Sequence, residues 1–222
     1  MRFTLTIPPA GSLKIGKQAY FVIPRGTELH RIHRDIFGST QFNGTDKGEA
    51  RFSPITDVAG AIVPTIYAAE TFDCATCEII LRCPDAPPPA SALGVRQIVF
   101  PTDFADRMHS VVRTTSDLKL VNITTAGQRL IGVDHSLLLA GPTSTYPATR
   151  AWAAQIHAKS PDAHGLYYHS HQYGPKFAIV LFGDRVPGAA LVPISQRSVA
   201  DPVCHDAIAA LADSLSIEYE DV

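Results

Sequence analysis

The chain has 222 residues, of which 45% are hydrophobic, and this is enough apolar material for one large domain with a substantial buried core. A formal net charge of −2 argues against direct nucleic-acid binding, and no apolar run approaches the roughly 18 to 20 residues that span a membrane. Four cysteines are too few for a disulfide scaffold, and Pro8 and Pro9 interrupt any signal-peptide core, so we expect a cytoplasmic protein.

Short apolar or alternating runs, separated by turn residues, predict strands along the whole chain. In chain order these runs are residues 3–7, 19–23, 28–33, 50–54, 62–68, 111–115, 118–123, 166–170, 177–182 and 191–194. Helical patterns cover residues 71–82, 124–131, 145–158 and 201–215. Thr71 or Asp73 is the expected N-cap of the first helix.

The order of these elements indicates the fold class. Strands and helices do not alternate regularly, so we expect an α+β fold with a mixed or antiparallel sheet flanked by helices, and not a doubly wound parallel sheet. The proline-rich residues 84–89 predict a surface loop after the first helix. Residues 1–222 are therefore expected to form a single domain.

An arginine, a glutamate and a serine follow one another along the chain, each within a distinctive local sequence, and they form a set with two further residues. In chain order the set is Arg31 within residues 30–34, Arg51 before Phe52, Tyr67 at a strand end, Glu78 in the next helix, and Ser170 at the end of residues 165–170. An apolar strand, residues 177–182, follows the serine segment.

This set resembles the RES domain family, which is named for such an Arg–Glu–Ser trio, over about residues 28–183. The resemblance implies an ADP-ribosyltransferase-like fold with a split sheet and action on NAD as the toxin half of a bacterial toxin–antitoxin pair. The chain departs from the family pattern at residues 49–52, where many members have glycine before the arginine and tryptophan after it. Residues 91–161 match no part of that pattern.

The resemblance implies a role for each residue of the set. Cleavage of the nicotinamide–ribose bond develops positive charge on the ribose, so the site needs a carboxylate, cations for the pyrophosphate and groups that fix the nucleotide. Glu78 is expected to stabilise the ribose cation, Arg31 and Arg51 to hold the phosphates, Tyr67 to stack on a ring, and Ser170 to fix the nucleotide. Arg31, Glu78 and Ser170 are thus the predicted catalytic residues, and NAD is a substrate with no separate cofactor.

Without the resemblance, each of these residues also has a structural interpretation. Arg31 can form a surface ion pair, Glu78 can lie on the solvent-facing stripe of its helix, and Tyr67 can be a core residue. A serine after a strand is often a local backbone cap, and this applies to Ser170.

Three functions remain open. The first is an NAD-consuming toxin that hydrolyses or phosphorolyses the nicotinamide–ribose bond and is neutralised by a helix-turn-helix antitoxin of the Xre type. The second is an ADP-ribosyltransferase that modifies a protein, and the third is an inactive module that only binds a partner. The sequence does not choose between water, phosphate and a protein side chain as acceptor. Homodimerisation is possible, but no coiled-coil pattern demands it.

Two short patterns raise the question of a metal site. His169 and His171 share one face of a predicted strand, and Cys74 and Cys77 form a Cys-x-x-Cys pair. No second pair with suitable spacing completes a tetrahedral set, so no metal is expected. A regular strand through Ser170 would also turn the serine away from both histidines.

Overall fold

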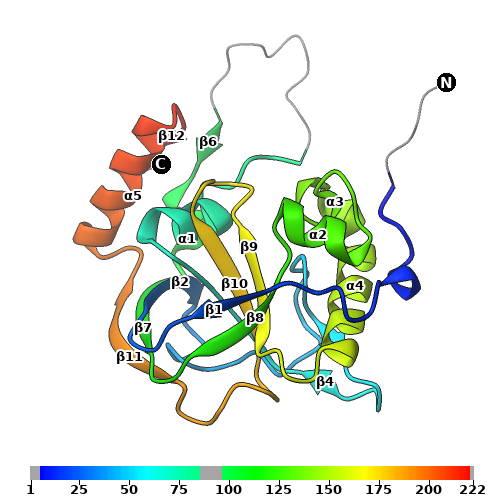
Figure 1. Cartoon of the computed structure of the whole chain (residues 1–222). Coiled ribbons are helices and arrows are strands. Elements are labelled where there is room, and N and C mark those ends of the chain that lie inside the picture. Colours follow the sequence, from blue (N-terminus) through cyan, green and yellow to red (C-terminus); the bar gives the residue numbers. More distant parts are fainter. Residues whose placement is uncertain (1–5, 86–96, 221–222) are drawn as a thin grey trace, which may run out of the picture.

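Residues 6–85 and 97–220, which this computed structural model describes, are built around a mixed eight-stranded sheet (Figure 1). The strand order is β1-β8-β9-β10-β5-β2-β7-β11, and neighbours are antiparallel except for β8 and β9. The strands are β1 (Tyr20–Ile23), β2 (Glu28–Arg34), β5 (Thr65–Ala69), β7 (Arg107–Thr114), β8 (Leu118–Asn122), β9 (Gly165–His169), β10 (Phe177–Phe182) and β11 (Leu191–Ser198). Two small pairs are formed by β3 (Ile55–Thr56) with β4 (Ile62–Val63), and by β6 (Ile98–Val99) with β12 (Glu218–Tyr219).

Most predicted strands are confirmed, although β7 begins four residues before the predicted strand 111–115 and β11 extends four residues beyond the predicted strand 191–194. The predicted strand 62–68 is divided at Pro64 into β4 and β5, because proline has no amide hydrogen to give to a ladder. The predicted strand 50–54 is wrong: the Ala50 amide donates to the Ser53 carbonyl at 3.0 Å and closes a turn. The predicted strand 3–7 lies mostly outside the described residues, as does most of the loop 84–89.

The four predicted helices are confirmed as α1 (Phe72–Ile79), α2 (Thr125–Ile131), α4 (Tyr146–Lys159) and α5 (Pro202–Ser214). Thr71 is the N-cap of α1, and its hydroxyl accepts a hydrogen bond from the Cys74 amide at 3.2 Å. A short additional helix, α3 (Leu137–Ala140), was not predicted because four residues are too few to show a helical period. The predicted fold class, α+β with a mixed sheet flanked by helices, is therefore confirmed.

The two faces of the sheet are buried in different ways. One face packs under the helices, where strand residues such as Val180 and Phe182 contact a cluster that includes Trp152 of α4 and Ile208 of α5. The other face packs on itself: its cluster consists of strand and loop residues such as Leu120 and its neighbours on β2, β5, β7, β9 and β10. A flat sheet cannot bring these side chains together, so the sheet is strongly curled.

The curled sheet is nearly split between β2 and β5. The register of these two strands contains a single pair, His30 opposite Ala69, whereas β2 pairs with β7 along its whole length. Beyond that pair β2 and β5 diverge, and the chain after β2 crosses back to β5 through a bridge between Asn43 and Thr65. The divergence of these two strands leaves a hollow in the sheet.

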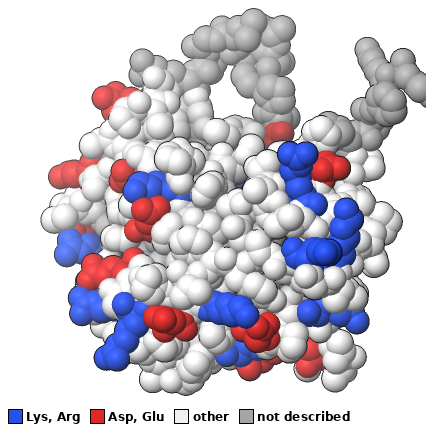
Figure 2. Space-filling model, in the orientation of Figure 1, with Lys and Arg blue, Asp and Glu red and all other residues white. Residues whose placement is uncertain are grey.

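The surface shows no single dominant charge on the face drawn in Figure 2. Basic and acidic side chains are interspersed over the lower part of that face. Among the described helices, none is both long and apolar enough to cross a membrane.

Candidate functional site

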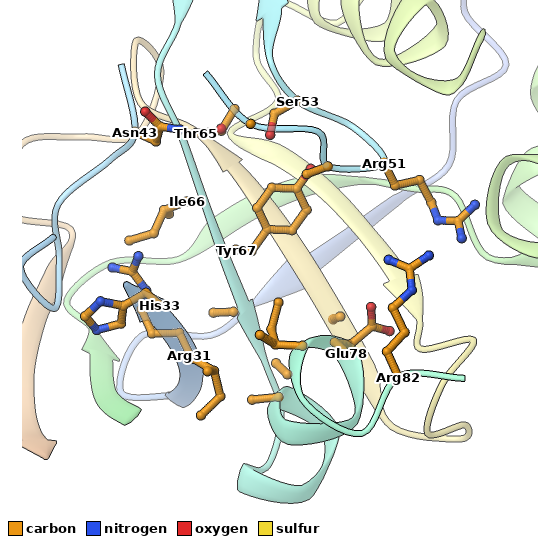
Figure 3. A pocket seen from close by; sticks show the side chains of 18 of the residues that line it. Arg31, His33, Asn43, Arg51, Ser53, Thr65, Ile66, Tyr67, Glu78 and Arg82 are labelled. Atoms are coloured by element: carbon orange, nitrogen blue, oxygen red, sulfur yellow. The ribbon is translucent and has the colours of Figure 1, made fainter. Parts of the chain in front are cut away.

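A pocket of about 430 Å³ opens where β2 and β5 diverge. Its wall includes residues His30–Arg34 of β2, Thr65–Ala69 of β5, the chain between β2 and β3, and Glu78 and Ile79 of α1. The segment around α3 and α4 closes the opposite side with Leu139 and Tyr146. Cavities of about 300–1,000 Å³ are typical of small-molecule and cofactor sites. Four of the five predicted site residues, Arg31, Arg51, Tyr67 and Glu78, line this pocket (Figure 3).

Arg31 projects from β2, and its guanidinium is largely buried. One terminal nitrogen, Nη1, donates to the carbonyls of Ser39 at 2.6 Å and Gly38 at 3.2 Å. Among the described residues, the Nε atom is buried without a hydrogen-bond partner. Burial lowers the pKa of Arg31 to about 10, which leaves the side chain charged at neutral pH. Arg31 therefore holds the loop after β2 in place through Nη1, and its remaining N–H groups can donate to an anion.

Glu78 lies in the last turn of α1 and is half-buried in the pocket wall. Burial raises the pKa of its carboxyl group, while a hydrogen bond from Ser170 and the charges of Arg51, Arg82 and His171 act in the opposite direction. The helix does not place Glu78 on a solvent-facing stripe. A carboxylate whose desolvation is offset by cations is typical of a functional site.

Ser170 lies behind Glu78 and is not part of the pocket wall. Its hydroxyl donates to Glu78 Oε1 at 2.5 Å and accepts from the backbone amides of Gln172 at 3.1 Å and Tyr173 at 2.9 Å. The single proton of the hydroxyl is thus committed to the carboxylate. The strand β9 ends at His169, and this break turns His171 into the pocket wall while Ser170 stays buried. A direct contact of Ser170 with a nucleotide stays a prediction.

Tyr67 stands in the middle of the pocket in Figure 3, with Arg31 on one side and Arg51 on the other. Its hydroxyl accepts a hydrogen bond from the Phe52 amide at 3.1 Å. Burial raises the pKa of Tyr67 to about 12, so the ring remains neutral. The strand β5 fixes one end of the Tyr67 side chain and this hydrogen bond fixes the other, so the ring can offer its face to a planar ligand.

Two further residues, Arg82 and Tyr146, were missed in the sequence. Figure 3 shows the Arg82 and Arg51 side chains pointing toward one another, with Glu78 beside Arg82. Both guanidiniums lie close to the Tyr146 ring, at 4.9 Å for Arg51 and 5.6 Å for Arg82. Arg82 follows Glu78 by four residues, a helical spacing that could have revealed it. Tyr146 falls in the part of the sequence that matched no pattern, so no signal marked it.

Two histidines of β2, His30 and His33, contribute to the pocket wall. His33 meets the Arg34 carbonyl through Nδ1 at 2.9 Å and the Ser110 hydroxyl through Nε2 at 2.8 Å. A carbonyl only accepts, so Nδ1 carries the proton and the neutral ring accepts from Ser110. His30 contacts His109 between ring nitrogens at 3.0 Å, and burial lowers the pKa of His109 to about 4. These rings are therefore neutral packing groups.

The pocket wall is much more basic than the chain as a whole. It contains six cationic and two anionic side chains: Arg31, Arg34, Lys47, Arg51, Arg82 and Arg107 against Glu49 and Glu78. A concave site with low-dielectric walls and this excess of one sign attracts ligands of the opposite charge. The geometry thus favours an anionic ligand with at least one planar ring. Within the described part of the chain, no group of three or more His, Cys, Asp or Glu residues is arranged to hold a metal ion.

Comparisons with known proteins bear on the family and the fold of the chain. A protein-family model described as RES domain matches residues 28–203, which begins where the predicted resemblance begins and extends past its expected end at residue 183. No curated protein matches the sequence. A chain in the crystal structure of the M. tuberculosis MbcT–MbcA toxin–antitoxin complex has a similar fold, with a TM-score of 0.61 and 12% identity over 90% of this chain and 96% of that one. Because the family model matches most of its length, this chain belongs to the RES domain family.

Proposed function

We propose that this protein cleaves the nicotinamide–ribose bond of NAD in the pocket between β2 and β5. The observation that carries the proposal is the meeting of Arg31 and Glu78, 47 positions apart in the numbering, in one cationic pocket around the Tyr67 ring. A dinucleotide has a doubly charged pyrophosphate and two planar bases, and this pocket offers cations and an aromatic face.

In the proposed reaction the bond between the ribose anomeric carbon and the nicotinamide nitrogen breaks, and its electron pair leaves with nicotinamide. The Glu78 carboxylate faces the positive charge that develops on the ribose and stabilises it. Arg31 grips the pyrophosphate with the donors that its own loop does not use. The anomeric carbon then bonds to an acceptor, which is water, inorganic phosphate or a protein side chain, and the proton that the acceptor loses passes to the solvent.

Ser170 has a supporting role in this scheme. Because its proton is committed to Glu78 Oε1 and its lone pairs to two amides, the serine orients the carboxylate and helps keep it ionised. Arg51 binds the ligand from the opposite wall, where Nη1 is already held by the Gly141 carbonyl at 3.0 Å.

We further propose that the protein is a cytoplasmic toxin held in check by an antitoxin. The support is membership of the RES domain family and the similar fold found in a solved toxin–antitoxin complex. The proposed partner is a helix-turn-helix protein of the Xre type that covers the pocket.

The test is incubation of the purified protein with NAD, followed by separation of the products by mass spectrometry. Release of nicotinamide with free ADP-ribose indicates hydrolysis, and release with a phosphorylated ADP-ribose indicates phosphorolysis. Label that stays on a macromolecule indicates protein ADP-ribosylation. Glu78→Gln removes the charge and keeps the shape, so we expect turnover to fall by about 100-fold or more.

An inactive binding module gives a different result. Such a protein consumes no NAD and shows no thermal shift with NAD, since a ligand that binds the folded state raises the melting temperature. Both observations together on the wild-type chain would reject the proposed activity.

A further inference from the structure

Tyr146 is the first residue of α4 and is 2% exposed, and it lines the pocket together with two cations, Arg51 and Arg82. Arg82 Nη2 donates a hydrogen bond to the Tyr146 hydroxyl, and its guanidinium carbon lies 5.6 Å from the ring centre. The Arg51 guanidinium carbon lies 4.9 Å from the same ring. Guanidiniums at such distances are attracted by the electron-rich face of an aromatic ring.

Tyr146 is itself held in place by the chain around it. The Thr149 hydroxyl shares its single proton between two carbonyl oxygens, that of Arg51 and that of Tyr146 at 3.1 Å. Just before α4, the Thr143 amide and hydroxyl donate to Asp85 Oδ2 at 3.0 and 2.5 Å. Asp85 also pairs with Arg82 at 3.6 Å. The start of α4 is thereby tied to the chain that carries each arginine.

The two arginines have like charges and would separate in the absence of such contacts. Arg51 is fixed further by its Nη1 atom, which donates to the carbonyls of Gly141 at 3.0 Å and Leu138 at 3.4 Å. One aromatic ring and one hydroxyl thus hold both cations at the end of the pocket where Glu78 lies.

We propose that Tyr146 is a positioning residue, which holds Arg51 and Arg82 in the places where they counterbalance the Glu78 carboxylate. This inference rests on the proposed function for its catalytic meaning, but the arrangement of charges can be tested without substrate. It also assigns Arg82, which the sequence pattern did not mark, to the same site.

The charged and titratable groups around Glu78 come from several elements. Those that act on its charge are Arg51 from the chain before β3, Arg82 after α1 and His171 after β9. Burial raises the pKa of Tyr168 on β9 and of Cys74 and Cys77 on α1 itself, and the Glu78 carboxylate in turn raises it further. Ser170 adds its hydrogen bond. The cations favour the ionised carboxylate and burial opposes it. Loss of either arginine from its position must therefore raise the pKa of Glu78.

The experiment follows the Glu78 carboxyl carbon by NMR in protein labelled with ¹³C-glutamate, with Glu78→Gln to assign the signal. Tyr146→Phe keeps the ring and removes the hydroxyl that holds Arg82. We expect the Glu78 titration to move to higher pH in Tyr146→Phe and in Arg82→Gln, and to stay near that of the wild type in Arg82→Lys. The matched control is Tyr167→Phe, which removes a hydroxyl from the other face of the sheet, where Tyr167 stacks on Phe21.

A second readout is NAD turnover. If the wild type is active, kcat/KM should fall by about tenfold in Tyr146→Phe, as for loss of a hydrogen bond to a charged group, and its acid limb should move to higher pH. A merely structural tyrosine would lower the melting temperature and leave both pH curves in place, and this result would overturn the inference. Failure of the wild type to consume NAD rejects the proposed function alone, because the Glu78 titration still decides the role of Tyr146.

Discussion

Glu78, which lines the pocket, and Ser170, which lies outside its wall, act as one unit, because the serine hydroxyl has one proton and donates it to the carboxylate over 2.5 Å. The backbone amides of Gln172 and Tyr173 donate to the serine hydroxyl oxygen, and they thereby fix the direction of its proton. Burial raises the pKa of Glu78, and the hydrogen bond from Ser170 makes the largest of the contributions that lower it. The ionised acid that the proposed reaction needs is therefore maintained partly by a residue that does not line the pocket.

Replacement of Ser170 by alanine should distinguish a role in orienting the Glu78 carboxylate from a role in binding NAD. We expect kcat for NAD cleavage to fall by about tenfold or more, because a hydrogen bond to a charged group is lost. The acid limb of the pH profile should move to higher pH, since the group that lowers the pKa of Glu78 has been removed. KM should change little. A large rise in KM with an unmoved acid limb would instead place the serine against the nucleotide.

His109 makes folding sensitive to mild acid. Burial lowers its pKa from 6.5 to about 4, so the unfolded chain binds a proton in this pH range that the folded chain does not. The free energy of unfolding should therefore fall as pH drops from about 6.5 to 4, by at most about 1.4 kcal/mol per pH unit for this group. Urea denaturation across that range measures the slope. In His109→Phe the slope should be smaller, and an identical slope would contradict this account.

The pocket contains four residues that a sequence pattern could identify and others that it could not. Arg31, Arg51, Tyr67 and Glu78 each stand in a recognisable local setting, and the fold brings all four together. Tyr146 enters the same wall only because α4 packs across the end of the pocket. Such long-range placement leaves no periodicity or motif in the sequence.

The strands β9 and β10 set the position of the loop that carries Ser170, and their close approach depends on Gly165. A Cβ atom at this position would lie 2.0 Å from the Val180 carbonyl oxygen, which belongs to the neighbouring strand. Only glycine allows the backbones to come so near.

Gly165→Ala should therefore destabilise the fold by about 3 kcal/mol, at the upper end of the usual cost of overpacking. The matched control is Gly11→Ala, where no atom lies within 4 Å of the new Cβ. The difference in denaturation midpoint between the two variants measures the effect. Equal midpoints would mean that β9 and β10 are not constrained by this contact.

Helices were more predictable than strands in this chain. The cap at Thr71 and the cap at Asp201, which accepts from the Val203 amide at 3.0 Å, are local signals that mark helix starts. The predicted strand at residues 50–54 has the right composition, but the chain turns there and gives its Arg51 side chain to the pocket. The composition of a segment indicates whether its side chains are buried, but not whether another strand lies close enough to pair with it.

At the scale of the molecule, the split of the sheet is the feature on which the site depends. The irregular order of strands and helices predicted a mixed sheet, and this is confirmed. The order of the strands, the curl, and the divergence of β2 from β5 after one pair could not be predicted, because they are set by packing between segments far apart in the chain. The pocket is a product of that packing, and its excess of cations stands out against a chain of net charge −2.

The most direct test of the central claim is calorimetric titration of NAD into two variants that separate binding from chemistry. Glu78→Gln should bind NAD with an affinity near that of the active pocket and turn over almost none. Arg31→Lys keeps the positive charge but loses the bidentate fork, so its affinity should fall by about tenfold or more. Equal affinity in wild type and Arg31→Lys, together with full turnover in Glu78→Gln, would contradict the account, since neither residue would then serve a dinucleotide in this pocket.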